Sequence, residues 1–193
     1  MSNNKQEKIK FSKAFWVANT VELFERAAYY GVFIVITLYL SRILGFNDIQ
    51  AASIAGIFSA CLYLLPTFAG ALADKIGFRN SMLIAFALLT MGYAGLAVYP
   101  TWLESAGLVS YSATTTFTGL LESNLQYGIL PIMALIVCGG AFIKSVISGT
   151  VAKETTPETR AKGFSIFYAM VNIGAFSGKT IVKPLREALG NEG

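Results

Sequence analysis

The chain has 193 residues, of which 54% are hydrophobic and 13% are charged, and its formal net charge is +4. A soluble domain carries about 25% charged residues, so this composition is typical of a membrane protein. The basic residues are spread along short connecting segments rather than gathered in one patch, which excludes nucleic acid as the expected partner.

Five apolar stretches are long enough to cross a bilayer core, which is about 30 Å thick and needs about 20 helical residues. We predict membrane-spanning helices at 14–43, 51–73, 81–98, 128–151 and 163–183. A basic tail (1–13) precedes them, a long connection (100–127) separates the third from the fourth, and a short tail (186–193) follows. The sequence therefore predicts an all-α membrane protein with one helical bundle over residues 14–185.

Lysine and arginine concentrate on the cytoplasmic side of membrane proteins. The starting tail and the second and fourth connections between the predicted helices hold most of these residues: Lys5, Lys8, Lys10, Lys13, Lys75, Arg79, Lys153, Arg160 and Lys162. The alternate connections contain only Arg42. We therefore expect a cytoplasmic amino terminus and an extracytoplasmic 100–127 connection in a plasma membrane, such as a bacterial inner membrane.

Two carboxylates and a guanidinium interrupt the first predicted span, at Glu22, Glu25 and Arg26. Residues three and four apart share a helix face, so Glu22, Arg26 and Tyr29 lie on one stripe with Glu25 beside them. With a rise of about 1.5 Å per residue, Glu22 lies roughly 12 Å and Arg26 roughly 18 Å from Ala14, near mid-bilayer. Each such charge costs about 2.5 to 3.5 kcal/mol in lipid. A water-filled cavity or mutual pairing is therefore required.

Lys144, about halfway along the fourth predicted span, needs an acidic partner for the same reason. Glu22 and Glu25 are the acidic residues that lie deep in a predicted span, so we expect the first and fourth helices to face each other. Protonation of either glutamate then removes a partner from a base, and a proton can act as a switch. The alternative is a fixed ionic cluster that only joins two helices.

Small residues at four-residue spacing predict faces where helix backbones approach closely in lipid. One such set lies in the second predicted helix and another in the fifth: Ala52, Gly56 and Ala60, then Gly174 and Gly178. The two cysteines each lie inside an apolar run, and the chain has no histidine and no glycine-rich phosphate loop after a strand. We therefore expect no disulfide framework, no metal, no cofactor and no enzyme activity.

Three short stretches carry a family resemblance. ELFERAAYYG (22–31), GALADKIGFRN (70–80) and FYAMVNIG (167–174) occur in this order along the chain. They resemble, respectively, the ExxERxxYYG signature, the loop signature after the second helix and the FYxxINxG pattern of the proton-coupled oligopeptide transporter family, a branch of the major facilitator superfamily. Tyr63, Pro66 and Lys144 also lie where that family has the same residue types.

The resemblance implies two six-helix bundles that rock around a central site and import di- and tripeptides with protons. It implies proton coupling through Glu22, Glu25, Arg26 and Lys144, a peptide site lined by Tyr29, Tyr30, Tyr63 and Asn172, and a gating loop with Gly70, Asp74, Lys75, Gly77 and Arg79. From the residues alone, the loop also fits a plain solvated turn, and the tyrosines also fit ordinary aromatic packing.

Two departures from the family leave alternatives open. The family has twelve or more spans and this chain has five, so we expect an amino-terminal part that lacks the carboxy-terminal bundle, or a transport-incompetent membrane piece that assembles with another subunit. Phe33 occupies the place of an arginine that helps to hold the substrate carboxylate in the family. A transporter of the same fold for a different small polar solute is therefore the other alternative.

Overall fold

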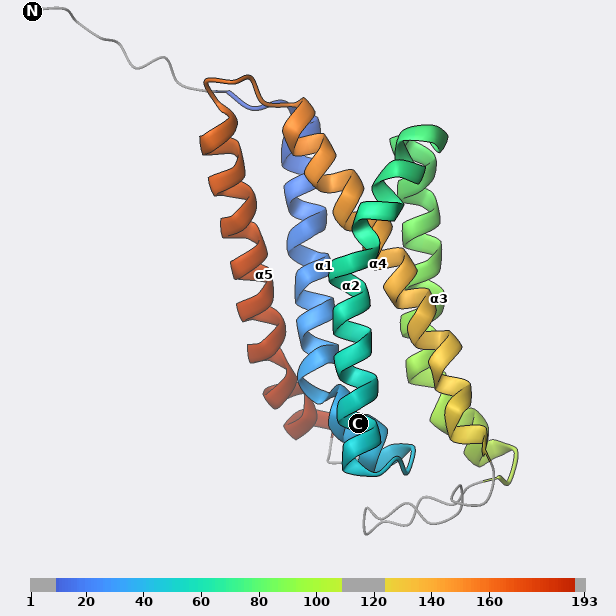
Figure 1. Ribbon diagram of the computed structural model, residues 1–193. Helices are drawn as coiled ribbons and strands as arrows, with labels where there is room; N and C mark the ends of the chain where they lie inside the picture. The colour runs from blue at the N-terminus through green and yellow to red at the C-terminus, as the bar shows by residue number, and fades with distance from the viewer. Residues whose placement is uncertain (1–9, 109–123, 190–193) are drawn as a thin grey trace, which may run out of the picture. The chain divides into compact units, whose positions relative to one another are not determined.

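The computed structural model describes residues 10–108 and 124–189, and every regular element within these ranges is helical. The α-helices are α1 (Lys13–Leu38), α2 (Asp48–Ile76), α3 (Phe78–Ser105), α4 (Ile129–Lys153) and α5 (Arg160–Leu189), as Figure 1 shows. A π-helical turn, Tyr39–Ile43, continues α1, and a 3-10 turn, Asn124–Gly128, precedes α4. The predicted all-α fold is confirmed. Residues 1–9 of the first predicted tail, 109–123 of the predicted connection and 190–193 of the last predicted tail lie outside the described residues.

Four helical segments of the described chain are long and apolar enough to cross a membrane. They are Lys13–Ile43, Asp48–Ile76, Phe78–Ser105 and Asn124–Lys153. Helix α5 is not among them, because polar and basic residues such as Asn172 and Lys179 interrupt its apolar stretch. A fifth span at 163–183 therefore stays a prediction, although α5 is helical over this whole range.

By its internal contacts the chain divides into two compact units. We call residues 30–146 the central unit, and residues 1–29 together with 147–193 the terminal unit. Helices α1 and α4 each run from one unit into the other, at Tyr29 and at Val146.

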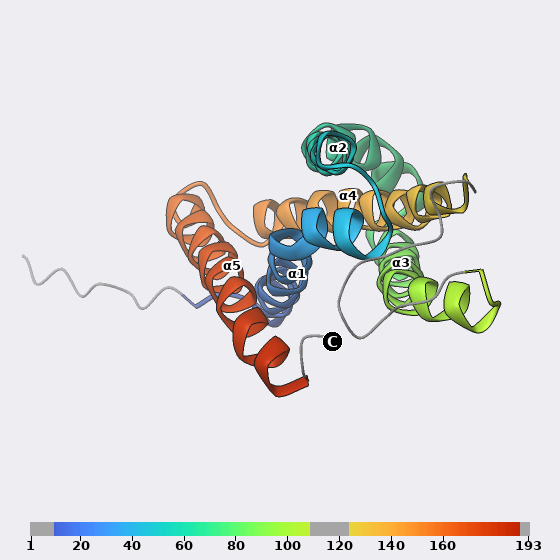
Figure 2. The ribbon, with the colours of Figure 1, turned by 90° about the horizontal axis from the view of Figure 1, so that it is seen from below.

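In the central unit, small residues let α4 pack closely along α3. A Cβ atom on Gly92 would lie 3.1 Å from the backbone nitrogen of Ile136, and one on Gly139 would lie 3.0 Å from the carbonyl oxygen of Ala85. Both distances are tighter than nine in ten real Cβ contacts, so glycine at these positions lets the two backbones approach closely. Figures 1 and 2 show α4 crossing α3 and continuing to α2.

A single residue, Gly77, joins α2 to α3. Its backbone has φ 86° and ψ 147°, and its N–H donates to the carbonyl of Ala73 over 2.9 Å, which ends α2. The carbonyl of Gly77 then accepts a hydrogen bond from the Ser81 hydroxyl at 2.9 Å, at the start of α3. The chain thus reverses direction with one residue outside regular helix.

We expect Gly77→Ala to lower the free energy of unfolding by about 1–3 kcal/mol, because this combination of φ and ψ is essentially restricted to glycine. Space is not the reason, since nothing lies within 4 Å of a Cβ placed there. The melting temperature (Tm) of the purified protein in detergent measures the effect. Gly56→Ala is the matched control, because its Cβ also meets nothing within 4 Å and its backbone is helical. Equal Tm values for the two variants would contradict the prediction.

In the terminal unit, α5 packs directly on the backbone of α1. A Cβ on Gly174 would clash with the carbonyl oxygen of Leu23 and lie 2.9 Å from the Cβ of Arg26. A Cβ on Gly178 would clash with the carbonyl oxygen of Ala27 and lie 3.0 Å from its Cα. The predicted close packing of these two glycines is confirmed.

The corresponding prediction for Ala52, Gly56 and Ala60 is wrong for the part of the chain that the structure describes. Nothing lies within 4 Å of a Cβ on Gly56, and the two alanines are exposed. Four-residue spacing of small residues therefore marked a helix crossing in α5 and an open face in α2.

Candidate functional site

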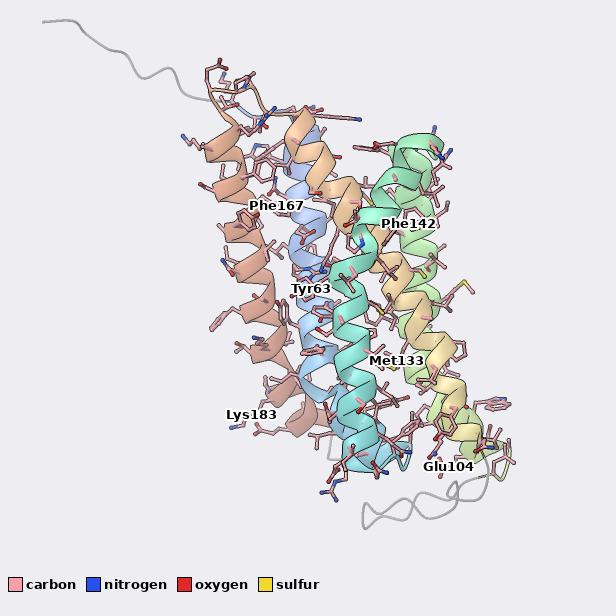
Figure 3. The ribbon with its side chains drawn as sticks, in the orientation of Figure 1. Tyr63, Glu104, Met133, Phe142, Phe167 and Lys183 are labelled. Carbon is pink, nitrogen blue, oxygen red and sulfur yellow. The ribbon has the colours of Figure 1, made fainter. Side chains whose placement is uncertain are left out.

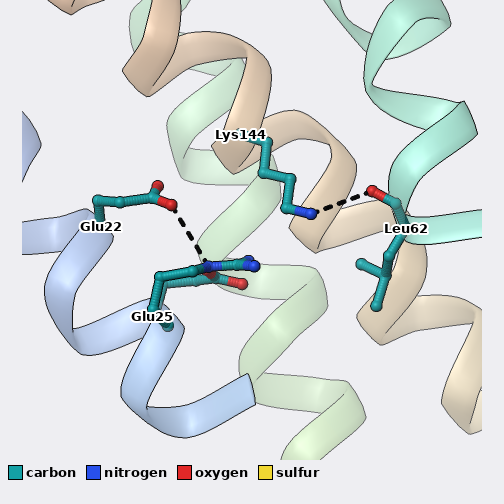
Figure 4. A network of polar contacts seen from close by, with 5 residues as sticks. Glu22, Glu25, Leu62 and Lys144 are labelled. Atoms are coloured by element: carbon teal, nitrogen blue, oxygen red, sulfur yellow. Dashed lines mark hydrogen bonds and ion pairs between the residues drawn. The ribbon is translucent and has the colours of Figure 1, made fainter. Parts of the chain in front are cut away.

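The charged residues predicted on one stripe of α1 are buried together. The exposed fraction is 3% for Glu22, 7% for Glu25 and 3% for Arg26. The Nε of Arg26 lies 3.3 Å from Oε1 of Glu22 and donates a hydrogen bond to Oε2 of Glu25, and Nη2 of Arg26 also pairs with Glu25. Figure 4 shows the Glu22–Arg26 ion pair. One guanidinium thus contacts both carboxylates; helical spacing accounts for its pairing with Glu22, four residues earlier, whereas Glu25 is the adjacent residue.

The cluster continues along the same stripe in both directions. The Cζ of Arg26 lies 5.0 Å from the ring centroid of the buried Tyr29, a cation–π geometry. One turn before Glu22, Asn19 is fully buried and its side-chain nitrogen donates to the carbonyl of Phe15 at 2.8 Å. Its Oδ1 has no hydrogen-bond partner among the described residues. Sequence reasoning missed Asn19, although its position three residues before Glu22 could have revealed it.

Together, Glu22, Glu25 and Arg26 carry a formal charge of −1, from two carboxylates and one guanidinium. A buried net charge is unfavourable unless a proton or another cation balances it. The arrangement is therefore suited to exchanging a proton or pairing with a second base.

We expect Arg26→Met to lower the free energy of unfolding by about 3–5 kcal/mol, because it leaves two buried carboxylates without their cation. The triple variant Glu22→Gln, Glu25→Gln, Arg26→Met is the control, since it removes all three charges at nearly constant side-chain shape. Its Tm should recover most of the loss. Equal Tm values for the single and triple variants would show that the ion pairs add nothing to the stability beyond side-chain packing.

In the central unit, Lys144 of α4 contacts α2. Its ammonium donates to the carbonyl oxygen of Leu62 over 3.3 Å and lies 4.3 Å from the ring centroid of Tyr63. Figure 4 shows the hydrogen bond to Leu62, and Figure 3 shows Tyr63 on α2. Sequence reasoning missed these neutral partners. The predicted pairing of Lys144 with Glu22 or Glu25 stays a prediction.

The predicted peptide-site residues differ widely in exposure. Tyr29 is buried and Tyr30 is half-buried, whereas Tyr63 is 64% exposed and Asn172 lies on an exposed face of α5. Two of them belong to the terminal unit and two to the central unit. Their assembly into one peptide site stays a prediction.

The predicted gating-loop residues surround the joint between α2 and α3. Asp74, Lys75 and Arg79 are exposed on either side of Gly77. Gly70 lies about two helical turns before Gly77, where a Cβ would be 3.6 Å from Cβ of Ser145 in α4. A gating role for these residues stays a prediction.

No protein-family model matches the chain. It is similar to dipeptide and tripeptide permease A of Salmonella typhi, with 30% identity over 172 residues, and of Escherichia coli K12, with 29% identity over 171 residues. Both alignments cover 86% of the chain and 29% of the relative. The protein of the same name from Yersinia pestis is 27% identical over 186 residues, which are 91% of the chain and 32% of the relative.

Helices that are long and apolar enough to span a membrane, with ionisable residues buried between their ends, are typical of a multi-pass membrane protein. The sequence similarity to these relatives shows that the chain is a homologue of the bacterial dipeptide and tripeptide permeases. The resemblance to the oligopeptide transporter family predicted from the three motifs is thereby confirmed. The chain spans about a third or less of the length of these relatives.

Proposed function

We propose that the chain forms part of a proton-coupled symporter that imports short peptides by alternating access, with its amino terminus in the cytoplasm and its helices in the plasma membrane, such as a bacterial inner membrane. The observation that carries the proposal is the buried Glu22–Glu25–Arg26 cluster on α1. Ionisable groups at membrane depth are costly and usually mark an ion or substrate pathway. The peptide substrate is inferred from the names of the relatives.

In the proposed cycle, the ammonium of Lys144 balances the net charge of the cluster. Protonation of Glu22 or Glu25 from the outside removes one negative partner and loosens the pairing with Arg26 and Lys144. Substrate then enters the cavity, the outer side closes and the inner side opens. Release of the proton to the cytoplasm restores the pairing, so each turnover moves substrate and proton together.

The remaining predicted residues have roles in the same cycle. Tyr29, Tyr30, Tyr63 and Asn172 provide rings, hydroxyls and an amide to hold a peptide. Asp74, Lys75 and Arg79 act at the membrane surface, where their charges make and break contacts as the cytoplasmic side opens. The Gly70 and Gly77 positions keep this segment compact.

We further propose that transport requires a second helical bundle, because the relatives are about three times as long as this chain. That bundle is encoded either on the same transcript or by another subunit. Sequencing the transcript beyond the codon for Gly193 distinguishes the two. Continuous coding sequence supports one long transporter, whereas a stop codon supports a membrane piece that acts by assembly with a partner.

Phe33 favours a second candidate, a transporter of the same fold for a different small polar solute. An apolar side chain replaces the arginine that the family resemblance would place there for a substrate carboxylate. A panel of labelled dipeptides, amino acids and anions decides between the candidates. Uptake restricted to dipeptides supports peptide import, and uptake restricted to another class supports the alternative.

The central test uses vesicles that contain the longest protein encoded by the transcript, or the chain with its partner subunit. Labelled dialanine should accumulate inside when the external medium is more acidic, and the pH gradient should dissipate faster with peptide than without it. Collapse of the gradient by a protonophore should reduce uptake to equilibration. Accumulation that is unaffected by the protonophore contradicts proton coupling.

A further inference from the structure

Two prolines lie inside apolar helices of the central unit, Pro66 in α2 and Pro100 in α3. Proline has no N–H, so the carbonyl four residues earlier loses its helical partner. These carbonyls belong to Leu62 and Leu96. In a bilayer no water replaces the missing donor, so each carbonyl needs a donor from elsewhere in the protein.

Each of the two carbonyls receives a donor from a different helical segment. The hydroxyl of Tyr39 donates to the carbonyl of Leu96 at 2.7 Å, and the ammonium of Lys144 donates to the carbonyl of Leu62 at 3.3 Å. The first donor is neutral and the second is a full charge. The carbonyl that each proline leaves without its helical donor is therefore bonded once by a neutral hydroxyl and once by a charged ammonium, whose burial at membrane depth costs free energy.

Two further contacts hold α4 at the Pro66 break. The Tyr63 ring lies under the Lys144 ammonium at 4.3 Å, and the hydroxyl of Ser145 lies 2.5 Å from the carbonyl oxygen of Pro66. That hydroxyl also lies 3.0 Å from the carbonyl of Ala141, its own helix. Two consecutive residues of α4 thus contact one turn of α2, on the face where the proline opens the backbone.

We propose that Pro66 is a positioning residue for Lys144. By freeing the Leu62 carbonyl beside the Tyr63 ring, it creates a docking point for the ammonium on α2. Both partners are neutral, so the dock keeps its affinity for the ammonium whatever the protonation state of the carboxylates. If the proposed proton cycle is correct, this dock holds the Lys144 charge while a glutamate is protonated.

A double-mutant cycle tests the dock without any transport measurement. Lys144→Met removes the donor at similar volume and should lower the Tm of the purified protein in detergent by about 2–4 °C. Pro66→Ala restores an N–H that can bond the Leu62 carbonyl within α2. In the Pro66→Ala background, Lys144→Met should therefore lower the Tm by less than half as much. Lys144→Arg, which keeps a charged donor, should retain most of the parent Tm.

Pro100 provides the matched controls. In a Pro100→Ala background, Lys144→Met should lower the Tm by as much as in the parent, because Pro100 frees the carbonyl of Leu96 and not that of Leu62. Tyr39→Phe should show the same non-additivity with Pro100→Ala that Lys144→Met shows with Pro66→Ala. An equal loss from Lys144→Met in the parent and Pro66→Ala backgrounds overturns the proposal.

A second cycle covers the case in which Pro66→Ala does not fold. Tyr63→Leu removes the ring face and Tyr63→Phe keeps it. We expect Tyr63→Leu to lower the Tm and Tyr63→Phe to leave it unchanged. In the Lys144→Met background, Tyr63→Leu should lower the Tm by a smaller amount. Strict additivity between these two positions overturns the dock. Because no substrate or proton gradient is present, these results are independent of whether the transport proposal succeeds.

Discussion

Lys144→Ala is expected to abolish uptake against a concentration gradient while exchange of substrate across the membrane continues. In the proposed cycle, Lys144 is the base that the cluster of Glu22, Glu25 and Arg26 must release when a glutamate is protonated. Each coupled proton in a gradient of one pH unit supports about tenfold accumulation of a neutral substrate. The parent should therefore reach about tenfold accumulation for each coupled proton, and the variant should stop at equal concentrations.

Two companion variants make this result specific. Lys153→Ala removes the same charge from the exposed end of α4 and should keep the parental accumulation. Glu22→Gln should stop accumulation as Lys144→Ala does, although it leaves the contact between Lys144 and Leu62 intact. Accumulation by Lys144→Ala at the level of the parent would show that coupling does not pass through this lysine.

Gly178→Val should cause the largest loss of stability among the packing variants. The Cβ of a valine at position 178 would clash with the carbonyl oxygen of Ala27 and lie 3.0 Å from the Cα of Ala27. Backbone atoms of α1 cannot rotate away as a side chain can, so α5 must separate from α1. Overpacking at a site that can relax costs about 1–3 kcal/mol, so we expect at least about 3 kcal/mol here, or a fall in Tm of roughly 6–12 °C.

Gly56→Val is the control for Gly178→Val, because it makes the same change in a helix of the same kind where nothing lies within 4 Å. It should keep at least the parent Tm, because valine has a higher helix propensity than glycine. Gly178→Ala should fall between the two in Tm. Similar Tm values for Gly178→Val and Gly56→Val would contradict the direct packing of α5 on the backbone of α1.

The cluster on α1 could be predicted from sequence because it depends on one helix. Once the apolar stretch is helical, the spacing of Glu22, Arg26 and Tyr29 determines that they share a face, and burial makes the guanidinium contact both carboxylates. The same reasoning missed Asn19, because a neutral amide costs less to bury at membrane depth than a charge and so indicates a polar site less strongly. Its full burial next to the cluster shows that the polar stripe is one turn longer than predicted.

The partners of Lys144 could not be predicted in the same way, because they depend on which helix packs against α4. Sequence reasoning sought an acidic residue, and a backbone carbonyl has no signature of its own in a sequence. The only signal was Pro66, which removes the N–H that would have satisfied Leu62. The contrast between Gly56 and Gly178 has the same origin, since identical spacing does not reveal which helix comes close.

The one-residue joint at Gly77 couples the motions of the helices on either side of it. Only Gly77 separates Ile76 from Phe78. A shift of α2 along its axis therefore also moves the start of α3. The exposed charges of Asp74, Lys75 and Arg79 lie on either side of this joint, so a movement of either helix displaces charges at the same end of the pair.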